Sequence, residues 1–152
     1  MIPNPAQRIE VELSIRRSPK SVRAWWTELP DDYTAKDPEE RPFRIRTLAR
    51  WHDGSELEAH WRRPDGSVVL AREILRVLPD GRWTFEGLDA RGYNIFDEFA
   101  AYPANGGDET LLRIVQILTA REPGAEEHFA AQFRTSRDVW RGAVPICERD
   151  AP

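Results

Sequence analysis

The sequence predicts an α+β domain in which one strand, a short helix, a long antiparallel meander and a long C-terminal helix follow one another along the chain. Three observations point to this class. Residues 8–15 alternate between apolar and polar side chains, three Asp-Gly turns divide residues 43–121 into pieces of strand length, and the residues after 122 carry apolar side chains at helical spacing. Because the strands follow one another without intervening helices, the class is α+β and not alternating α/β.

The N-terminal region is predicted to contain one strand and one helix. Ser18 and Pro19 supply a helix N-cap and a residue favoured at the first helical position, and the helix continues to Pro30. The acidic, proline-containing segment from Asp31 to Pro42 is expected to be a loop with at most one helical turn. The strand before the helix buries one face, which carries Ile9, Val11, Leu13 and Ile15.

The central region, from Phe43 to Arg121, is predicted to be an antiparallel meander. An Asp-Gly pair between alternating segments is a strong hairpin signal, and it occurs three times at similar spacing. Two further strands are expected at residues 93–102 and 110–121, on either side of a turn-rich segment. The three turns are His52-Asp53-Gly54, Pro64-Asp65-Gly66 and Pro79-Asp80-Gly81.

The C-terminal region is predicted to form the long helix. Glu122 and Pro123 open it, with acidic residues in the first turn and arginines in the last, as the helix dipole favours. Gly142 and Pro145 are expected to end it. One apolar stripe along the helix is formed by Phe129, Phe133, Ser136 and Trp140.

The register of each hairpin follows from its turn, because a shift of one residue moves every side chain to the other face. At the first turn, a three-residue loop pairs Ala49 with Leu57 on the inner face and Arg50 with Glu56 on the outer face. We therefore expect this loop length at the first turn, since it matches apolar with apolar and opposite charges with each other.

The second and third turns place Glu73 on the inner, apolar face. Three-residue loops there pair Glu73 with Leu57 on one side and with Gly87 on the other, while Glu58 pairs with Arg72 outside. A loop that differs by one residue would turn Arg72 inward instead, so either register leaves an ionisable group in the interior. A buried carboxylate needs a partner, water or a raised pKa. The possible partners are Arg113, Gln116, His128 and Gln132.

Asp97 and Glu98 pose the same question. Both alternating sets of residues 93–100 are amphipathic, so one of the two acids faces inward if the strand is regular. The length of the loop before this strand is not defined by the sequence, and both orientations stay open.

Composition limits the classes of function. The 152 residues are expected to form a single domain, 1–152. The 26 acidic residues outnumber the 22 basic ones, which argues against a nucleic-acid partner although only two of the basic residues are lysines. The single cysteine, Cys147, excludes an internal disulfide and a cysteine-based zinc site. The N-terminal residues lack signal-peptide features and no apolar run reaches the length of a membrane span, so a cytoplasmic location is expected.

No sequence motif for a metal or a cofactor is present. His52, His60 and His128 lack the spacing of metal ligands, and no serine lies in a nucleophile-elbow sequence. We therefore expect no cofactor and no metal, and a chain that is a monomer or a homodimer.

Three stretches together resemble the START-like, or SRPBCC, superfamily. They are RIEVELSIRRSPKSVRAWWTEL at residues 8–29, FRIRTLARWHDGSELEAHWRRPDGSVVLAREILRVLPDGRWTFEG at residues 43–87, and EPGAEEHFAAQFRTSRDVWRG at residues 122–142. The similarity is one of pattern and element order, and it covers nearly the whole chain. It implies the helix-grip fold, a curved antiparallel sheet of about six or seven strands wrapped around the C-terminal helix.

The resemblance also implies an internal cavity that binds a hydrophobic small molecule such as a lipid, a sterol or a polyketide. Such a cavity is expected to have a volume of about 300–1,000 Å³. The ligand-binding residues that the resemblance implies are Trp61, Glu73, Leu75, Phe85, Phe129, Gln132 and Phe133.

Three functions remain open at this point. The first is a non-catalytic carrier or sensor of a hydrophobic molecule. The second is a cyclase- or hydrolase-type enzyme in which Glu73, or whichever of Asp97 and Glu98 faces inward, acts as general base. The third is a chaperone-associated interaction module that uses the exposed helix and the arginine-rich outer face of the sheet.

Overall fold

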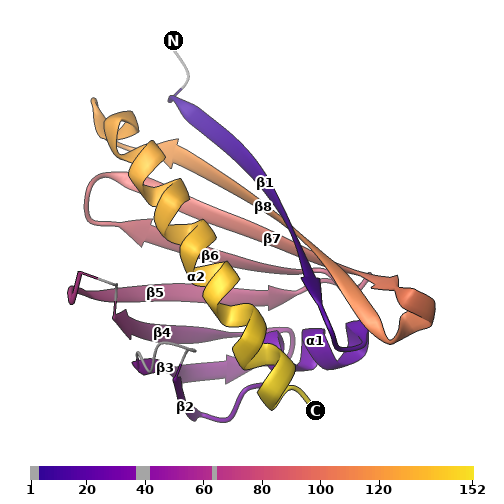
Figure 1. Ribbon diagram of the computed structural model, residues 1–152. Helices are drawn as coiled ribbons and strands as arrows, with labels where there is room; N and C mark the ends of the chain where they lie inside the picture. Colours follow the sequence, from indigo (N-terminus) through magenta and orange to yellow (C-terminus); the bar gives the residue numbers. More distant parts are fainter. Residues whose placement is uncertain (1–3, 37–41, 63–64) are drawn as a thin grey trace.

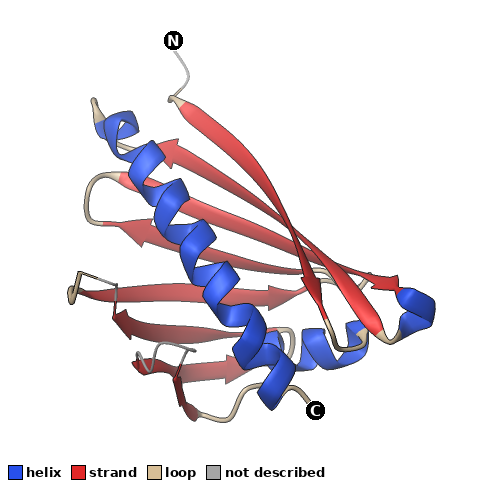
Figure 2. Ribbon diagram, in the orientation of Figure 1, coloured by secondary structure: helices blue, strands red, loops and turns tan. Residues whose placement is uncertain are grey.

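An eight-stranded antiparallel sheet curves around one long helix (Figures 1 and 2). The computed structural model describes residues 4–36, 42–62 and 65–152, without the side chains of Pro42 and Trp61. The strand order is β1-β8-β7-β6-β5-β4-β3-β2, and helix α2 crosses the concave face of the sheet. The elements are β1 (Ala6–Ile15), α1 (Pro19–Thr27), β2 (Asp32–Lys36), β3 (Pro42–Trp51), β4 (Gly54–Arg62), β5 (Val68–Val77), β6 (Trp83–Asp89), β7 (Tyr93–Ala104), β8 (Glu109–Ala120) and α2 (Phe129–Asp150).

The predicted fold class is confirmed, but the sheet has one strand more than the six or seven expected. The additional strand is β2, which lies in the segment expected to be a loop. It pairs with β3, where Ala35 lies opposite Phe43 and is buried, and Asp32 forms an ion pair with Arg44 at 2.7 Å. These contacts with β3 stabilise a short edge strand in which three of the five residues, Asp32, Ala35 and Lys36, are of types depleted in strands.

Helix α1 begins as predicted and α2 ends later than predicted. Ser18 caps α1 by accepting a hydrogen bond from the Ser21 backbone N–H. Helix α2 passes through Gly142 and Pro145 and continues to Asp150. Its last turns are buried against the core through Ala143, Ile146 and Cys147, and this packing outweighs the local preference of glycine and proline to end a helix.

The registers of the second and third hairpins are confirmed. Glu73 lies opposite Leu57 on β4 and opposite Gly87 on β6, and Glu58 lies opposite Arg72. Both hairpins therefore direct Glu73 to the concave side of the sheet, under α2.

The predicted register of the first hairpin is wrong. Trp51 pairs with Gly54, so the loop contains only two residues and Ala49 lies opposite Glu56. Beyond a bulge between Thr47 and Ala49 the register shifts by one residue, and Thr47 lies opposite Leu57. A Cβ on Gly54 would lie 2.1 Å from the carbonyl oxygen of Leu75. Gly54 is thus required for close contact between β4 and β5, and not for the turn itself.

The core lies between the concave face and the two helices. Its centre is a group of aromatic rings: Trp83 stacks on Phe99 with centroids 5.4 Å apart, and Trp140 of α2 meets Phe99 edge-on at 6.2 Å. A second, smaller cluster under the start of α2 contains Tyr93, Leu118, Ala120, Ala125, Phe129 and Phe133. None of the helices formed by the described residues is both long and apolar enough to cross a bilayer.

The outer face of the sheet carries arginines that are paired with acids. Arg113 contacts Glu10 at 2.7 Å, and Arg72 lies 3.8 Å from Glu56. The expected pair between Arg50 and Glu56 is wrong because the two-residue loop places Arg50 opposite Ser55, and the Arg50 side chain contacts Asp31 at 2.8 Å. This outer surface is therefore one of alternating charges.

Candidate functional site

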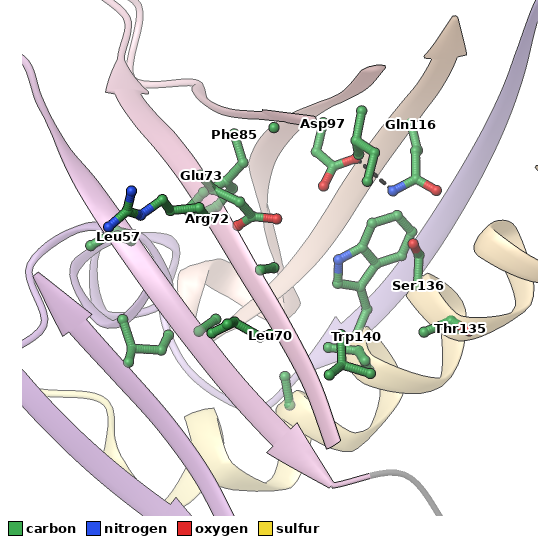
Figure 3. A pocket seen from close by; sticks show the side chains of 18 of the residues that line it. Leu57, Leu70, Arg72, Glu73, Phe85, Asp97, Gln116, Thr135, Ser136 and Trp140 are labelled. Carbon is green, nitrogen blue, oxygen red and sulfur yellow. Dashed lines mark hydrogen bonds between the residues drawn. The ribbon is translucent and has the colours of Figure 1, made fainter. Parts of the chain in front are cut away.

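A cavity of about 170 Å³ lies between the concave face of the sheet and α2 (Figure 3). Its walls are mostly apolar, with aromatic side chains from α1, β6, β7 and α2. The cavity reaches the surface beside Leu70 and Leu88, which are 62% and 71% exposed. The principal apolar lining residues are Trp25, Trp26, Leu29, Ile45, Leu57, Ala59, Ala71, Phe85, Ile95, Phe99 and Trp140.

The volume limits what the cavity can hold. It is smaller than the 300–1,000 Å³ expected for a lipid or drug-sized ligand, and it is close to the ~150 Å³ of an engineered apolar cavity that binds benzene. The described residues therefore leave room for a molecule with a single ring.

Glu73 projects its carboxyl group into this cavity (Figure 3). The pairing of β5 with β6 places it beside Gly87, where a Cβ would lie 3.5 Å from the Glu73 Cγ. Because Gly87 has no side chain, the Glu73 side chain lies against the bare backbone of β6. Burial without a hydrogen-bond or ion-pair partner among the described residues raises the pKa of Glu73 to about 7.

Asp97 is the acid of β7 that faces inward, which answers the question that the sequence left open. It is 6% exposed and accepts a 2.7 Å hydrogen bond from Gln116 Nε2, whereas Glu98 points outward and contacts Arg82 at 2.7 Å. Burial and the charge of Glu73 raise the pKa of Asp97 well above its usual range, and the Gln116 hydrogen bond opposes this shift. The cavity therefore contains two carboxyl groups that repel each other when both are ionised.

The partners expected for Glu73 lie elsewhere. Gln116 bonds to Asp97, Arg113 lies on the outer face with Glu10, and His128 lies 3.4 Å from Glu127.

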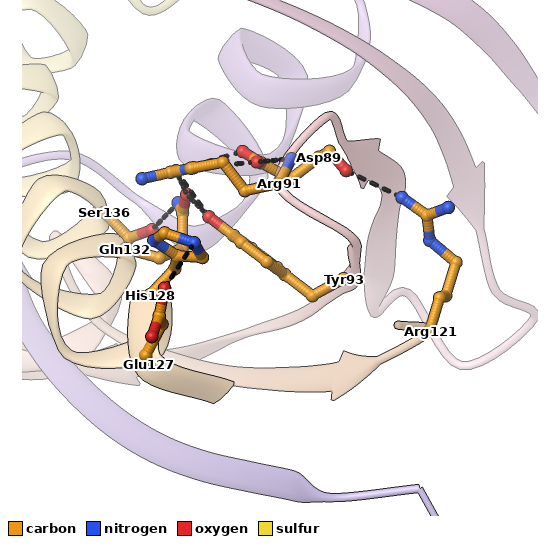
Figure 4. A network of polar contacts seen from close by, with 8 residues as sticks. All are labelled: Asp89, Arg91, Tyr93, Arg121, Glu127, His128, Gln132 and Ser136. Carbon is orange, nitrogen blue, oxygen red and sulfur yellow. Dashed lines mark hydrogen bonds and ion pairs between the residues drawn. The ribbon is translucent and has the colours of Figure 1, made fainter. Parts of the chain in front are cut away.

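Gln132 belongs to a separate polar network at another side of the cavity (Figure 4). Its Oε1 accepts a 2.9 Å hydrogen bond from the Tyr93 hydroxyl, and its Nε2 donates to Ser136 Oγ at 2.9 Å. Arg91 donates to the Tyr93 oxygen and to Gln132 Oε1, while its Nε lies 2.9 Å from Asp89. In this network each side chain has a partner, and the positive charge of Arg91 faces a carboxylate.

The structure brings three of the seven proposed ligand-binding residues to the cavity wall: Glu73, Phe85 and Gln132. Leu75, Phe129 and Phe133 are buried in the core clusters, outside the lining. The backbone of Trp61 lies in β4, but its side chain is outside the described part of the structure.

Sequence reasoning missed the part of α2 that meets the cavity. Ser136 and Trp140 line it, one and two turns beyond Phe133 on the predicted helical stripe. The stripe was the signal that could have found them, because residues at this spacing share one helix face. Where along the helix the cavity lies depends on the crossing of α2 over the sheet, which the stripe does not define.

Metal-binding geometry is not found in the described part of the chain. No group of three or more His, Cys, Asp or Glu residues there is close enough together to hold an ion.

Solved structures of other proteins share this architecture. The Zhui aromatase/cyclase from Streptomyces sp. R1128 superposes with a TM-score of 0.67 at 12% sequence identity, over 95% of this chain and 95% of that one. The chain has the helix-grip fold. Norcoclaurine synthase from Thalictrum flavum gives 0.64 at 9% identity over 97% of both chains, and a protein of unknown function from Staphylococcus aureus gives 0.63 at 14% identity over 96% of both chains.

The likeness at these identities concerns the helix-grip fold alone. No protein-family model and no curated protein matches the sequence. Functional arguments about this helix-grip protein therefore depend on its own cavity.

Proposed function

We propose that this protein binds a small, mostly apolar molecule with a single ring in the cavity between the sheet and α2, as a non-catalytic carrier or sensor. The observation that carries the proposal is an aromatic-walled cavity of about 170 Å³ whose wall includes the carboxyl groups of Glu73 and Asp97. Aromatic side chains offer large contact areas to a flat ring. A sterol or a long acyl chain, which the sequence resemblance allowed, exceeds this volume.

The test fills the cavity and asks whether binding disappears. Ala71 lines the cavity on β5, so Ala71→Phe places a ring inside it. Ala131→Phe adds the same atoms on the exposed face of α2 and is the matched control. Binding of benzyl alcohol is followed by protein-detected NMR, with the shifts of residues around Phe85 and Trp140 as the readout.

We expect benzyl alcohol to shift these resonances in the native protein and in Ala131→Phe, and to lose this effect in Ala71→Phe. If benzyl alcohol still shifts these resonances in a folded Ala71→Phe variant, benzyl alcohol binds elsewhere and the proposed site is refuted.

A second function, general-base catalysis, is favoured by one observation. The Glu73 carboxyl has a pKa raised to about 7 and projects into the same apolar cavity, so near neutral pH it is able both to accept and to release a proton. A base in this position suits removal of a proton next to a carbonyl group, the step that starts an aldol-type cyclisation.

A reporter reaction tests the catalytic alternative without knowledge of the natural substrate. Acetophenone has one ring and a methyl group acidified by its carbonyl, and exchange of these protons in D₂O is visible by NMR. If Glu73 is a general base, the protein accelerates the exchange and Glu73→Gln abolishes the acceleration. An exchange rate that equals the buffer rate supports the non-catalytic function.

A further inference from the structure

The two polar regions of the cavity differ in how many of their hydrogen-bonding groups lack a partner. The network of Tyr93, Gln132 and Ser136 matches its donors and acceptors internally. The opposite region contains the carboxyl groups of Glu73 and Asp97, for which the described residues supply a single side-chain donor, Gln116 Nε2. When the two carboxyl groups lose their protons, this region therefore holds more hydrogen-bond acceptors than the one side-chain hydrogen bond it receives.

The Gln116 amide holds a further buried acceptor, on its side away from Asp97 (Figure 3). Its nitrogen is used by Asp97, and its oxygen is buried without a hydrogen-bond partner among the described residues. Buried polar groups in native proteins normally have partners, so a set of acceptors that lacks donors marks a place where a bound molecule supplies them.

No cation of the described lining neutralises these acids. Arg72 is exposed and points away from the cavity, as Figure 3 shows. Arg91 lies in the other network, where Asp89 faces it at 2.9 Å (Figure 4).

We infer that the ligand carries a protonated primary amine, placed between Glu73 and Asp97, on a ring held against the aromatic wall. This inference rests on the proposed function and deepens it. An ammonium group has three N–H donors and a positive charge, which matches two carboxyl groups better than a hydroxyl with its single donor. The rings of Phe85 and Trp140 in the same wall provide π faces that also favour a cation.

The same arrangement selects against acids. A carboxylate ligand would bring a negative charge next to two carboxyl groups in an apolar cavity, where no cation of the described lining faces it and any ionised neighbour repels it. The inference therefore names a ring-bearing amine and excludes the corresponding ring-bearing acid.

The experiment compares benzylamine with benzyl alcohol, which have the same ring and the same one-carbon arm. Affinities are measured by NMR titration at pH 8. We expect benzylamine to bind at least about ten-fold more tightly than benzyl alcohol, because a charge-assisted hydrogen bond in an apolar site contributes a factor of this size. Glu73→Gln and Asp97→Asn, which keep the side-chain shapes, should each reduce this preference.

Glu86→Gln is the matched control. Glu86 is on β6, one residue before Gly87 and on the outer face, so its removal changes the same charge without changing the cavity. The preference for benzylamine should persist in this variant.

The outcomes separate the two proposals. Equal affinity for the two compounds, or a preference that survives in both cavity variants, overturns the amine inference and leaves the binding function intact. If neither compound reaches the cavity in the native protein, the binding function itself is refuted, and the inference with it.

Discussion

Carboxyl groups on the two faces of the sheet lie in opposite environments: those on the outer face contact arginines, and those on the concave face are buried without a basic partner among the described residues. On β7, Asp97 and Glu98 are consecutive residues, yet Asp97 is buried beside a second acid while Glu98 contacts Arg82 at 2.7 Å. The outer acid Glu10 has a pKa that hydrogen bonds from Arg113 and Arg8 lower, whereas burial raises the pKa of Glu73 to about 7. The pleat of the strand decides which environment each acid meets.

The two kinds of acid differ in what they contribute: the exposed acids form ion pairs at the surface, and the buried acids lie in the candidate site. Exposed ion pairs contribute little to stability and keep the outer face soluble. An acid that is buried without a basic partner destabilises the fold, and such groups are concentrated at functional sites. Glu73 and Asp97 are therefore the residues whose presence is hardest to explain by folding alone.

The largest effect is expected for an aromatic ring on the inner face. Phe99→Ala removes a fully buried ring that contacts Trp83, Phe85 and Trp140, and it should lower the free energy of unfolding by about 3–5 kcal/mol. Phe96→Ala, on the outer face of the same strand and only half-buried, should cost less than half as much. Urea denaturation of both variants measures this, and equal losses would mean that the two faces do not differ in packing.

The second largest effect is expected on the pH dependence of the free energy of unfolding. Glu73 keeps its proton in the folded protein up to about pH 7, while the unfolded chain loses it near 4.5, so the folded state binds protons more tightly. The stabilisation is complete below about pH 4.5 and is lost as the pH rises through 7. Between pH 5 and pH 8 the free energy of unfolding should fall by about 2–3 kcal/mol from this group.

Glu73→Gln should flatten this pH dependence, and Glu86→Gln should leave it as in the native protein. The groups that face Glu73 are Leu57 of β4, Gly87 of β6 and the side chain of Asp97 from β7, so Asp97 is the titratable neighbour within the described lining. Denaturation midpoints at several pH values between 5 and 8 measure the slope. Native-like slopes in Glu73→Gln would show that the carboxyl is not held in a desolvated position.

The smallest change in stability is expected for a substitution on the outer face of the sheet. Arg82→Ala removes the side-chain contacts with Asp80 and Glu98, but Asp80 still accepts a hydrogen bond from the backbone N–H of residue 82. The pKa of Asp80 is lowered by these hydrogen bonds, so their stabilisation is present at neutral pH and is lost on acidification. We expect a loss smaller than the two above that disappears in high salt, measured as thermal midpoints at two salt concentrations. A large, salt-insensitive loss would contradict the comparison.

Local signals in the sequence were sufficient to predict the strand register wherever the turn residues and the apolar–polar alternation agreed. The second and third Asp-Gly turns defined the registers of β4, β5 and β6, and with them the inward direction of Glu73 and Phe85. The expected neighbour pairs followed from counting residues outward from each turn.

The failures have a common cause, which is that tertiary contacts outweighed local preference. The bulge near Leu48 shifts the pairing of β3 by one residue, so that Thr47 lies opposite Leu57 but Ala49 lies opposite Glu56, and counting outward from the turn does not detect it. Pro145 stays inside α2 because its neighbours are buried, and β2 exists because β3 offers it a paired edge. The orientation of Asp97 depended on a loop length that no side-chain pattern specifies.

Gly87 leaves free space in the cavity wall because it has no side chain. In the row of residues that runs across the sheet from Leu57 to Glu73, Gly87 and Ile95, it is the one position without a side chain. Its bare backbone is the gap over which a carboxyl group from one strand approaches an acid two strands away. A Cβ at position 87 would lie 3.0 Å from the Arg72 carbonyl oxygen and 3.5 Å from the Glu73 Cγ, so even alanine there would press on the β5 backbone next to Glu73 while every charged group stayed in the sequence.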